Sequence, residues 1–122
     1  MWDESDILSK AWLVREAVNL VLPSDMSVNR IFLIGSYAKG NANEWSDLDL
    51  LVELNGKKKY PSWEQITEIS KVINHKRIHV IYGCELTQES LRRKRGDKFA
   101  YREICITTFG VNNGPFKQKA II

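Results

Sequence analysis

The sequence contains few cysteines and no long hydrophobic run. Its two cysteines, Cys84 and Cys105, belong to no CxxC pair, so they predict neither a disulfide framework nor a zinc finger. No apolar stretch approaches the roughly 20 residues that a membrane-spanning helix needs. The N-terminal residues Met1 to Glu4 lack the basic and then apolar pattern of a signal peptide. We therefore expect a cytoplasmic protein with no membrane partner.

The chain has little excess charge, with a formal net charge of +3. The excess is concentrated in two basic runs, residues 57–59 and 92–95. Such runs contact the phosphates of RNA or DNA in some proteins and are solvated loops or helix ends in others, and both readings stay open. Internal repeats and linkers rich in Pro, Gly or Ser are absent, so we expect one domain over residues 1–110 and a flexible tail over residues 111–122.

Hydrophobic periodicity predicts alternating helices and strands. Asp3 or Ser5 is the expected N-cap of a helix that runs to about Leu22 and ends before Pro23. Ser62 is the expected N-cap of another helix, and Trp63, Ile66, Ile69 and Val72 mark its apolar face. Strands are predicted at residues 31–34, 48–54, 78–82 and 104–109, a helix from Thr87 to about Arg95, and a helical turn at residues 98–103. The order indicates an α/β (α+β) fold, with a mixed sheet of about four strands flanked by helices.

A Gly-Ser pair follows the first predicted strand. Gly35 permits a sharp turn or the close approach of another group to the backbone. Ser36 can cap a short helix whose backbone N–H groups, with its own hydroxyl, would face an anion such as a triphosphate. The P-loop pattern GxxxxGK[ST] is absent. Taken alone, the pair is also an ordinary turn.

Two aspartates flank Leu48 at the start of the second predicted strand. Asp47 and Asp49 stand at positions i and i+2, so their carboxylates point to the same side of the strand. Their mutual repulsion would be relieved by Mg²⁺, which prefers hard oxygen ligands, and a two-metal site could stabilise both the attacking and the leaving oxygen of a displacement. The alternative is that both side chains simply meet water at an exposed strand end.

The spacing of these motifs resembles a known signature. Gly35-Ser36, ten further residues and Asp47-Leu48-Asp49 are similar to the signature of the polymerase-β-type nucleotidyltransferase superfamily. The segment IGSYAKGNANEWSDLDLLVEL resembles its small members, the minimal nucleotidyltransferases, many of which are antitoxins. The resemblance implies that Gly35 and Ser36 hold the triphosphate of ATP or another NTP, and that Asp47 and Asp49 ligate Mg²⁺, with Mn²⁺ as a substitute. Lys39 stands where the family often has Arg, and either contacts phosphate or is solvated.

The resemblance is incomplete at one catalytic position. Family members that catalyse transfer commonly carry a third acidic residue on a following strand, and His79 aligns with it here. A neutral imidazole could act as a general base, or His79 could be an exposed residue without a role. Glu53 shares the face of the aspartates but lies about 13 Å along the strand from Asp49. Glu85 follows the third predicted strand and is another substitute.

Three functions are compatible with these residues. The first is metal-dependent transfer of a nucleoside monophosphate, AMP from ATP, to a hydroxyl acceptor. In the minimal family that acceptor can be a tyrosine of a partner HEPN toxin, which implies an antitoxin role in a toxin-antitoxin system. The second is a catalytically weakened module that binds a nucleotide or a partner protein. The third is RNA binding through the basic runs. The oligomeric state, including a homo-oligomer, stays open.

Overall fold

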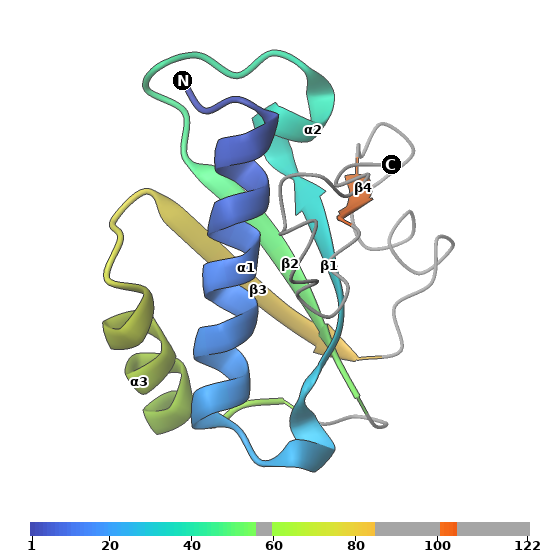
Figure 1. The fold of residues 1–122 in the computed structure, drawn as a ribbon, viewed down its shortest axis with the longest axis vertical. Coiled ribbons are helices and arrows are strands. Elements are labelled where there is room, and N and C mark those ends of the chain that lie inside the picture. The colour runs from blue at the N-terminus through green and yellow to red at the C-terminus, as the bar shows by residue number, and fades with distance from the viewer. Residues whose placement is uncertain (56–59, 85–100, 105–122) are drawn as a thin grey trace, which may run out of the picture.

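The structure is a computed structural model, and it describes residues 1–55, 60–84 and 101–104. Within these residues a four-stranded mixed sheet is covered on one face by two helices (Figure 1). This arrangement confirms the predicted fold class. In chain order the elements are α1 (Glu4–Val21), the 3₁₀ turn η1 (Ser24–Met26), β1 (Val28–Ile34), α2 (Gly35–Lys39), β2 (Leu48–Leu54), α3 (Trp63–Ile73), β3 (Ile78–Cys84) and β4 (Tyr101–Ile104).

The strand order β3-β2-β1-β4 decides which chain segments meet. β1 runs antiparallel to both β2 and β4, whereas β2 and β3 are parallel. The end of β1 therefore lies beside the starts of β2 and β3, at one edge of the sheet. The polar segments that follow β1 and precede β2 and β3 are thereby brought together.

α1 begins and ends as its sequence predicts. Asp3 is the N-cap, and its side chain accepts a hydrogen bond from the amide of Asp6 while the Asp6 carboxylate accepts one from the amide of Asp3. Leu22 is the C-cap, directly before Pro23. Residues spaced at helical intervals face the sheet and are buried, among them Ile7, Leu8, Ala11, Val14, Ala17 and Val18. No helix among the described residues is long and apolar enough to cross a membrane.

The two faces of β1 are both buried. Ile31 and Leu33 join the main core beneath α1 and α3, while Phe32 and Ile34 pack with Leu51 and the ring of Tyr101 on the other face. This explains the uninterrupted apolar run of residues 31–34. β2 places Leu48, Leu50, Val52 and Leu54 in the main core, and on its other face Leu51 and Glu53 are buried while Asp49 is partly exposed.

Two predicted strand boundaries and one predicted helical turn were wrong, and the predicted apolar face of one helix was correct only in part. β1 begins at Val28 rather than residue 31, and β3 continues to Cys84 rather than residue 82. Tyr101–Ile104 is a strand where a helical turn was predicted, because it pairs with Ile31–Ile34 of β1, and this tertiary pairing outweighs local helix preference. α3 buries Ile69 and Ile73, whereas Trp63 and Val72 are exposed.

Several other predictions fall on residues outside the described part of the chain. These are the helix from Thr87 to Arg95, the continuation of the last strand over residues 105–109, both basic runs and the tail over residues 111–122.

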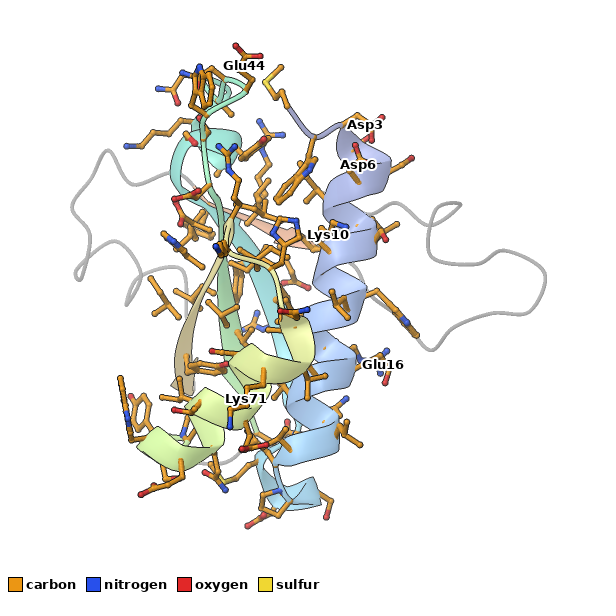
Figure 2. All side chains as sticks on the ribbon, turned by 90° about the vertical axis from the view of Figure 1, so that its left-hand side faces the viewer. Asp3, Asp6, Lys10, Glu16, Glu44 and Lys71 are labelled. Atoms are coloured by element: carbon orange, nitrogen blue, oxygen red, sulfur yellow. The ribbon has the colours of Figure 1, made fainter. Side chains whose placement is uncertain are left out.

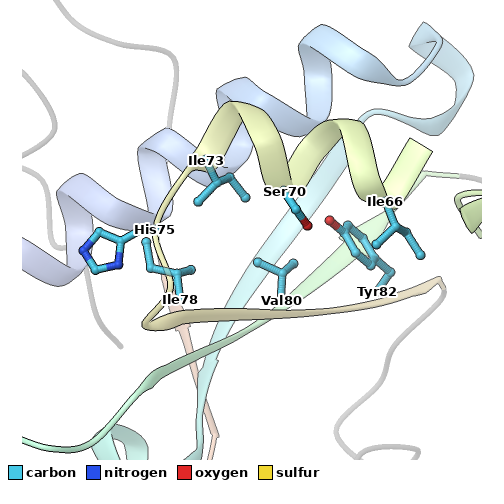
Figure 3. Close-up of a pocket in the computed structure, with 7 residues that line it drawn as sticks. All are labelled: Ile66, Ser70, Ile73, His75, Ile78, Val80 and Tyr82. Carbon is cyan, nitrogen blue, oxygen red and sulfur yellow. The ribbon is translucent and has the colours of Figure 1, made fainter. Parts of the chain in front are cut away.

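A small cavity of about 130 Å³ lies between α3 and β3 (Figure 3). Ile73, Ile78 and Val80 contribute apolar walls, and Ser70 and Tyr82 contribute hydroxyl groups. Burial raises the pKa of Tyr82 to about 12, because the phenolate would lose its hydration there. Because β-strand side chains alternate, the β3 residues that line this cavity (Ile78, Val80 and Tyr82) point away from the face of β3 that carries His79.

We expect Tyr82 to make the protein less stable in strong alkali. In the unfolded chain the phenol ionises near its ordinary pKa of 10.0, but in the folded chain it stays protonated to about pH 12. The folded state therefore binds more protons in this window, and the free energy of unfolding should fall as the pH rises from 10 to 12. Urea denaturation at several alkaline pH values measures this fall. Tyr82→Phe should show a smaller decline, and an identical decline in both proteins would exclude this origin.

Candidate functional site

Three chain segments meet at the edge of the sheet where β1 ends. In the antiparallel pairing of β1 and β2, Ile34 lies opposite Asp49. In the parallel pairing of β2 and β3, Asp49 lies opposite His79. Since Leu48 and Ile78 are buried in the main core, the alternation of side chains puts Asp49 and His79 on the opposite face of the sheet, away from α1 and α3.

Gly35 allows Asp49 to lie directly against the backbone. The φ angle of Gly35 is +70°, a conformation that side chains with a Cβ rarely adopt. A Cβ built on Gly35 would overlap the Oδ2 atom of Asp49 and lie 3.2 Å from its Cγ. Glycine is therefore required twice, once for the turn and once for the contact with Asp49.

The short helix α2 starts at Gly35 itself. The predicted cap at Ser36 was wrong, because the N-cap is Ile34 and no side chain caps this helix. Ser36 lies in the first turn, where backbone N–H groups lack partners within the helix. α2 ends at Gly40, whose φ is +79° and whose amide donates to the carbonyl groups of Ser36 and Tyr37. The Gly-Ser pair thus presents its first-turn amides beside Asp49.

A hydrogen-bonded turn over residues 43–46 places Asp47 at the same edge of the sheet. The hydroxyl of Ser46 accepts from the amide of Asn43, and the amide of Ser46 donates to the carbonyl of Asn43. The Arg77 side chain donates to the Ser46 carbonyl at 3.3 Å, and the Arg77 carbonyl accepts from the amide of Leu48 at 2.8 Å. Arg77 is therefore hydrogen-bonded to the two residues on either side of Asp47, which fixes the start of β2 beside the start of β3.

The carboxylates of Asp47 and Asp49 share one imidazole. His79 Nε2 is 3.5 Å from Asp47 Oδ2, and His79 Nδ1 is 3.4 Å from Asp49 Oδ1. The other oxygen of Asp47, Oδ1, is 3.5 Å from Arg77 Nε. A neutral imidazole can donate to only one carboxylate, whereas the imidazolium can donate to both. The arrangement gathers two acidic and two basic side chains within contact distance.

The donor set at this edge fits Mg²⁺. The side chains of Asp47 and Asp49 are 40% and 32% exposed, so both can reach water and a bound phosphate. Mg²⁺ is commonly held by one or two carboxylates, with water and substrate phosphate oxygens filling the other positions. Within the described ranges, no group of three or more His, Cys, Asp and Glu side chains is arranged to hold a metal ion. The protein oxygens available there are thus those of the aspartate pair.

Glu53 is not available as a third acidic residue at this edge. Although it shares the face of Asp49, it is only 1% exposed, and Arg30 holds both of its oxygens at 2.7 Å. Asn29 donates to the same carboxylate at 2.6 Å. The hydrogen bond to Glu53 is also the main cause that raises the pKa of Arg30. Glu53 therefore belongs to a buried ion pair.

Two further residues were predicted for the site, Lys39 and Glu85. Lys39 is exposed at the last position of α2, and no contact joins it to the aspartates in the described part of the chain. Glu85 lies outside the described residues. Arg77 was missed by the sequence analysis, although its spacing from His79 repeats that of Asp47 from Asp49 and could have indicated it.

Comparison with known proteins places the chain among nucleotide-transferring domains. The family model described as "Nucleotidyltransferase domain" matches residues 14–105. The chain is also similar to a solved structure from Sulfolobus solfataricus described as that of a candidate nucleotidyltransferase, with 21% identity and a TM-score of 0.45 over 82% of this chain and 87% of that one. No curated protein gives a significant match.

We expect Gly35→Ala to destabilise the protein more than Gly40→Ala. Both glycines have a positive φ, which costs an alanine about 1–2 kcal/mol. A Cβ at Gly40 would meet nothing within 4 Å, whereas one at Gly35 would overlap the Asp49 carboxylate. Crowding of this kind adds about 1–3 kcal/mol. Chemical denaturation of the two variants gives the difference, and equal losses of stability would argue against a tight contact between Gly35 and Asp49.

Proposed function

The chain belongs to the nucleotidyltransferase domain family, and from that premise we propose that it transfers AMP from ATP to a hydroxyl acceptor with the help of Mg²⁺. The observation that carries the proposal is the convergence of Asp47, Asp49 and the first turn of α2 at one edge of the sheet. This juxtaposition provides carboxylate oxygens for a cation beside backbone amides for an anion. A magnesium-bound triphosphate combines both charges.

Each residue would have a separate task. Gly35 and Ser36 would bind the triphosphate through the amides of the first turn, with Lys39 as a further phosphate contact. Asp47 and Asp49 would ligate Mg²⁺, or Mn²⁺ in its place. When bound, the ion supplies positive charge that stabilises the negative charge developing on the phosphate oxygens. Arg77 would hold Asp47 in position from the side.

The proposed reaction is a displacement at the α-phosphorus of ATP. The oxygen of the acceptor hydroxyl forms a bond to that phosphorus, the bond to the bridging oxygen breaks, and pyrophosphate leaves. The hydroxyl proton must be removed, and His79 is the base that we assign to it. Its side chain is 57% exposed and within 3.5 Å of both aspartates, so an acceptor could reach it.

The acceptor that we favour is a tyrosine hydroxyl of a partner HEPN toxin. Support comes from the resemblance of residues 34–54 to the minimal nucleotidyltransferases. The partial exposure of Asp47, Asp49 and His79 is also compatible with an acceptor carried by another protein. A second candidate is a weakened module that binds a nucleotide or a partner without transfer. It is favoured by His79, which replaces an acidic residue beside the aspartate pair.

We expect Asp47→Asn and Asp49→Asn to weaken ATP binding in the presence of Mg²⁺ by at least about tenfold, and to reduce AMP transfer by about 100-fold or more. Each change removes a charged metal ligand and relieves repulsion between two carboxylates, but also weakens a partly exposed contact with Arg77 or His79, so the free energy of unfolding should change by no more than about 1 kcal/mol. Calorimetric titration of ATP with and without Mg²⁺, and labelled ATP with a co-expressed partner, provide the measurements. Glu16→Gln, an exposed change on α1, is the control (Figure 2). Unchanged binding in both aspartate variants would refute the proposed site.

The role of His79 can be separated from nucleotide binding. We expect His79→Ala to lower the rate of AMP transfer by about 100-fold, as loss of a general base does, with little change in ATP affinity. His79→Asp should recover transfer, because a carboxylate can accept the same proton. Transfer rates under saturating ATP measure both effects. A wild-type protein that binds ATP with Mg²⁺ but transfers nothing to its partner would instead support the weakened module.

A further inference from the structure

A second cavity, of about 200 Å³, lies beside Arg77, the residue that contacts Asp47. Four parts of the chain line it. Met1 and Trp2 precede α1, Tyr37 lies on α2, Glu44 and Ser46 lie on the loop between α2 and β2, and Arg77 precedes β3. In Figure 2 Glu44 is labelled on the loop at the same end of the molecule as Asp3. Arg77 belongs both to this cavity and to the site, because its Nε contacts Asp47. A molecule that contacts Arg77 in the cavity would therefore be one side chain away from Asp47.

The aromatic wall of the cavity is held in place by several contacts. The rings of Trp2 and Tyr37 are stacked, with centroids 6.3 Å apart and planes inclined by 22°. His75 packs edge-to-face against Trp2, with ring centroids 5.2 Å apart and an angle of 73° between the ring planes. The Tyr37 hydroxyl accepts a hydrogen bond from the backbone amide of Trp2 at 3.1 Å. The wall is thus preformed. Tyr37 stacks on the Trp2 ring, Lys10 Nζ lies over that ring at 5.9 Å from its centroid, and the surface left to a ligand is more polar than apolar.

The polar groups of the cavity have opposite hydrogen-bonding character. Glu44 is exposed, and its carboxylate forms no hydrogen bond or ion pair with any residue that the structure describes. Arg77 uses Nε toward Asp47 and one Nη2–H toward Ser46, which leaves further N–H donors. The cavity therefore combines a free acceptor and a cationic donor beside the Trp2–Tyr37 pair.

We propose that this cavity binds the base of the nucleotide whose triphosphate lies at Gly35-Ser36. The inference rests on the proposed function and extends it to base recognition. A nucleobase is small and flat, and its edge carries hydrogen-bond donors and acceptors that match the Glu44 carboxylate and the Arg77 guanidinium. A phosphate group would be repelled by Glu44, and an apolar ligand would leave the Glu44 carboxylate without a partner.

The same groups favour a particular class of base. A carboxylate accepts from an exocyclic amino group, and a guanidinium donates to ring nitrogen or carbonyl acceptors. Adenine, guanine and cytosine carry an amino group, whereas uracil does not. Glu44 therefore selects amino-bearing bases over uracil, and ATP over UTP.

The test compares ligands that share a triphosphate but differ in the base. Calorimetry on the full chain with Mg²⁺ uses ATP, UTP and inorganic tripolyphosphate, for the wild type, Glu44→Ala and Glu16→Ala. We expect the wild type to bind ATP about tenfold more tightly than UTP or tripolyphosphate, as one hydrogen bond to a charged group implies. Glu44→Ala should lose this preference and leave tripolyphosphate affinity unchanged. Glu16→Ala, at another exposed acidic position, on α1, should behave as the wild type.

The outcomes separate this inference from the proposed function. If all three ligands bind the wild type equally well and Glu44→Ala changes nothing, the base pocket is refuted and the triphosphate site stands. If none of them binds, the proposed function fails and the base pocket fails with it. If Glu44→Ala impairs only the KM for the acceptor, with ATP affinity intact, the cavity belongs to the acceptor and the inference is overturned.

Discussion

The contact between the Asp49 carboxylate and the backbone of Gly35 is the constraint on which the rest of the site depends. It requires a residue without a Cβ, a positive φ at the end of β1, and the register that sets Ile34 opposite Asp49. The same turn that admits the carboxylate also starts α2. An acidic side chain and the amides of a helical first turn, which lack partners within the helix, therefore meet because of one glycine. A cation and an anion bound together suit such a place.

The hydrophobic core holds the polar edge in register. Leu48 and Ile78 are both buried beneath the helices and lie opposite each other in the parallel pairing of β2 and β3. Each is flanked by polar residues: Asp47 precedes β2 and Asp49 lies on it, and Arg77 precedes β3 and His79 lies on it. Because side chains alternate along a strand, burying the apolar residues turns the flanking charges to the other face, where acidic and basic groups meet.

Two acidic residues of β2, Glu53 and Asp49, differ in burial and in hydrogen-bond partners, and this difference decides which of them can bind a ligand. Glu53 and Asp49 share a face, yet Glu53 is buried and fully bound by Arg30 and Asn29 at hydrogen-bond distance. A buried carboxylate needs such partners, since its desolvation is otherwise costly. Asp49 is partly exposed and its contact with His79 is longer, at 3.4 Å. Only the latter has oxygens accessible to a ligand.

The sequence by itself determined what depends on near neighbours. The cap at Asp3, the bounds of β2, the glycine turn and the paired aspartates follow from spacing within a few residues, where local sterics and side-chain periodicity decide the outcome. Only the tertiary structure decided what depends on distant pairing: the strand at Tyr101, the buried face of α3, the contact of Arg77 with Asp47, and the cavity between Trp2 and Glu44. These features join segments whose separation in the chain carries no periodic signal. Their positions are fixed by strand register and helix packing, which form only when the whole core is assembled.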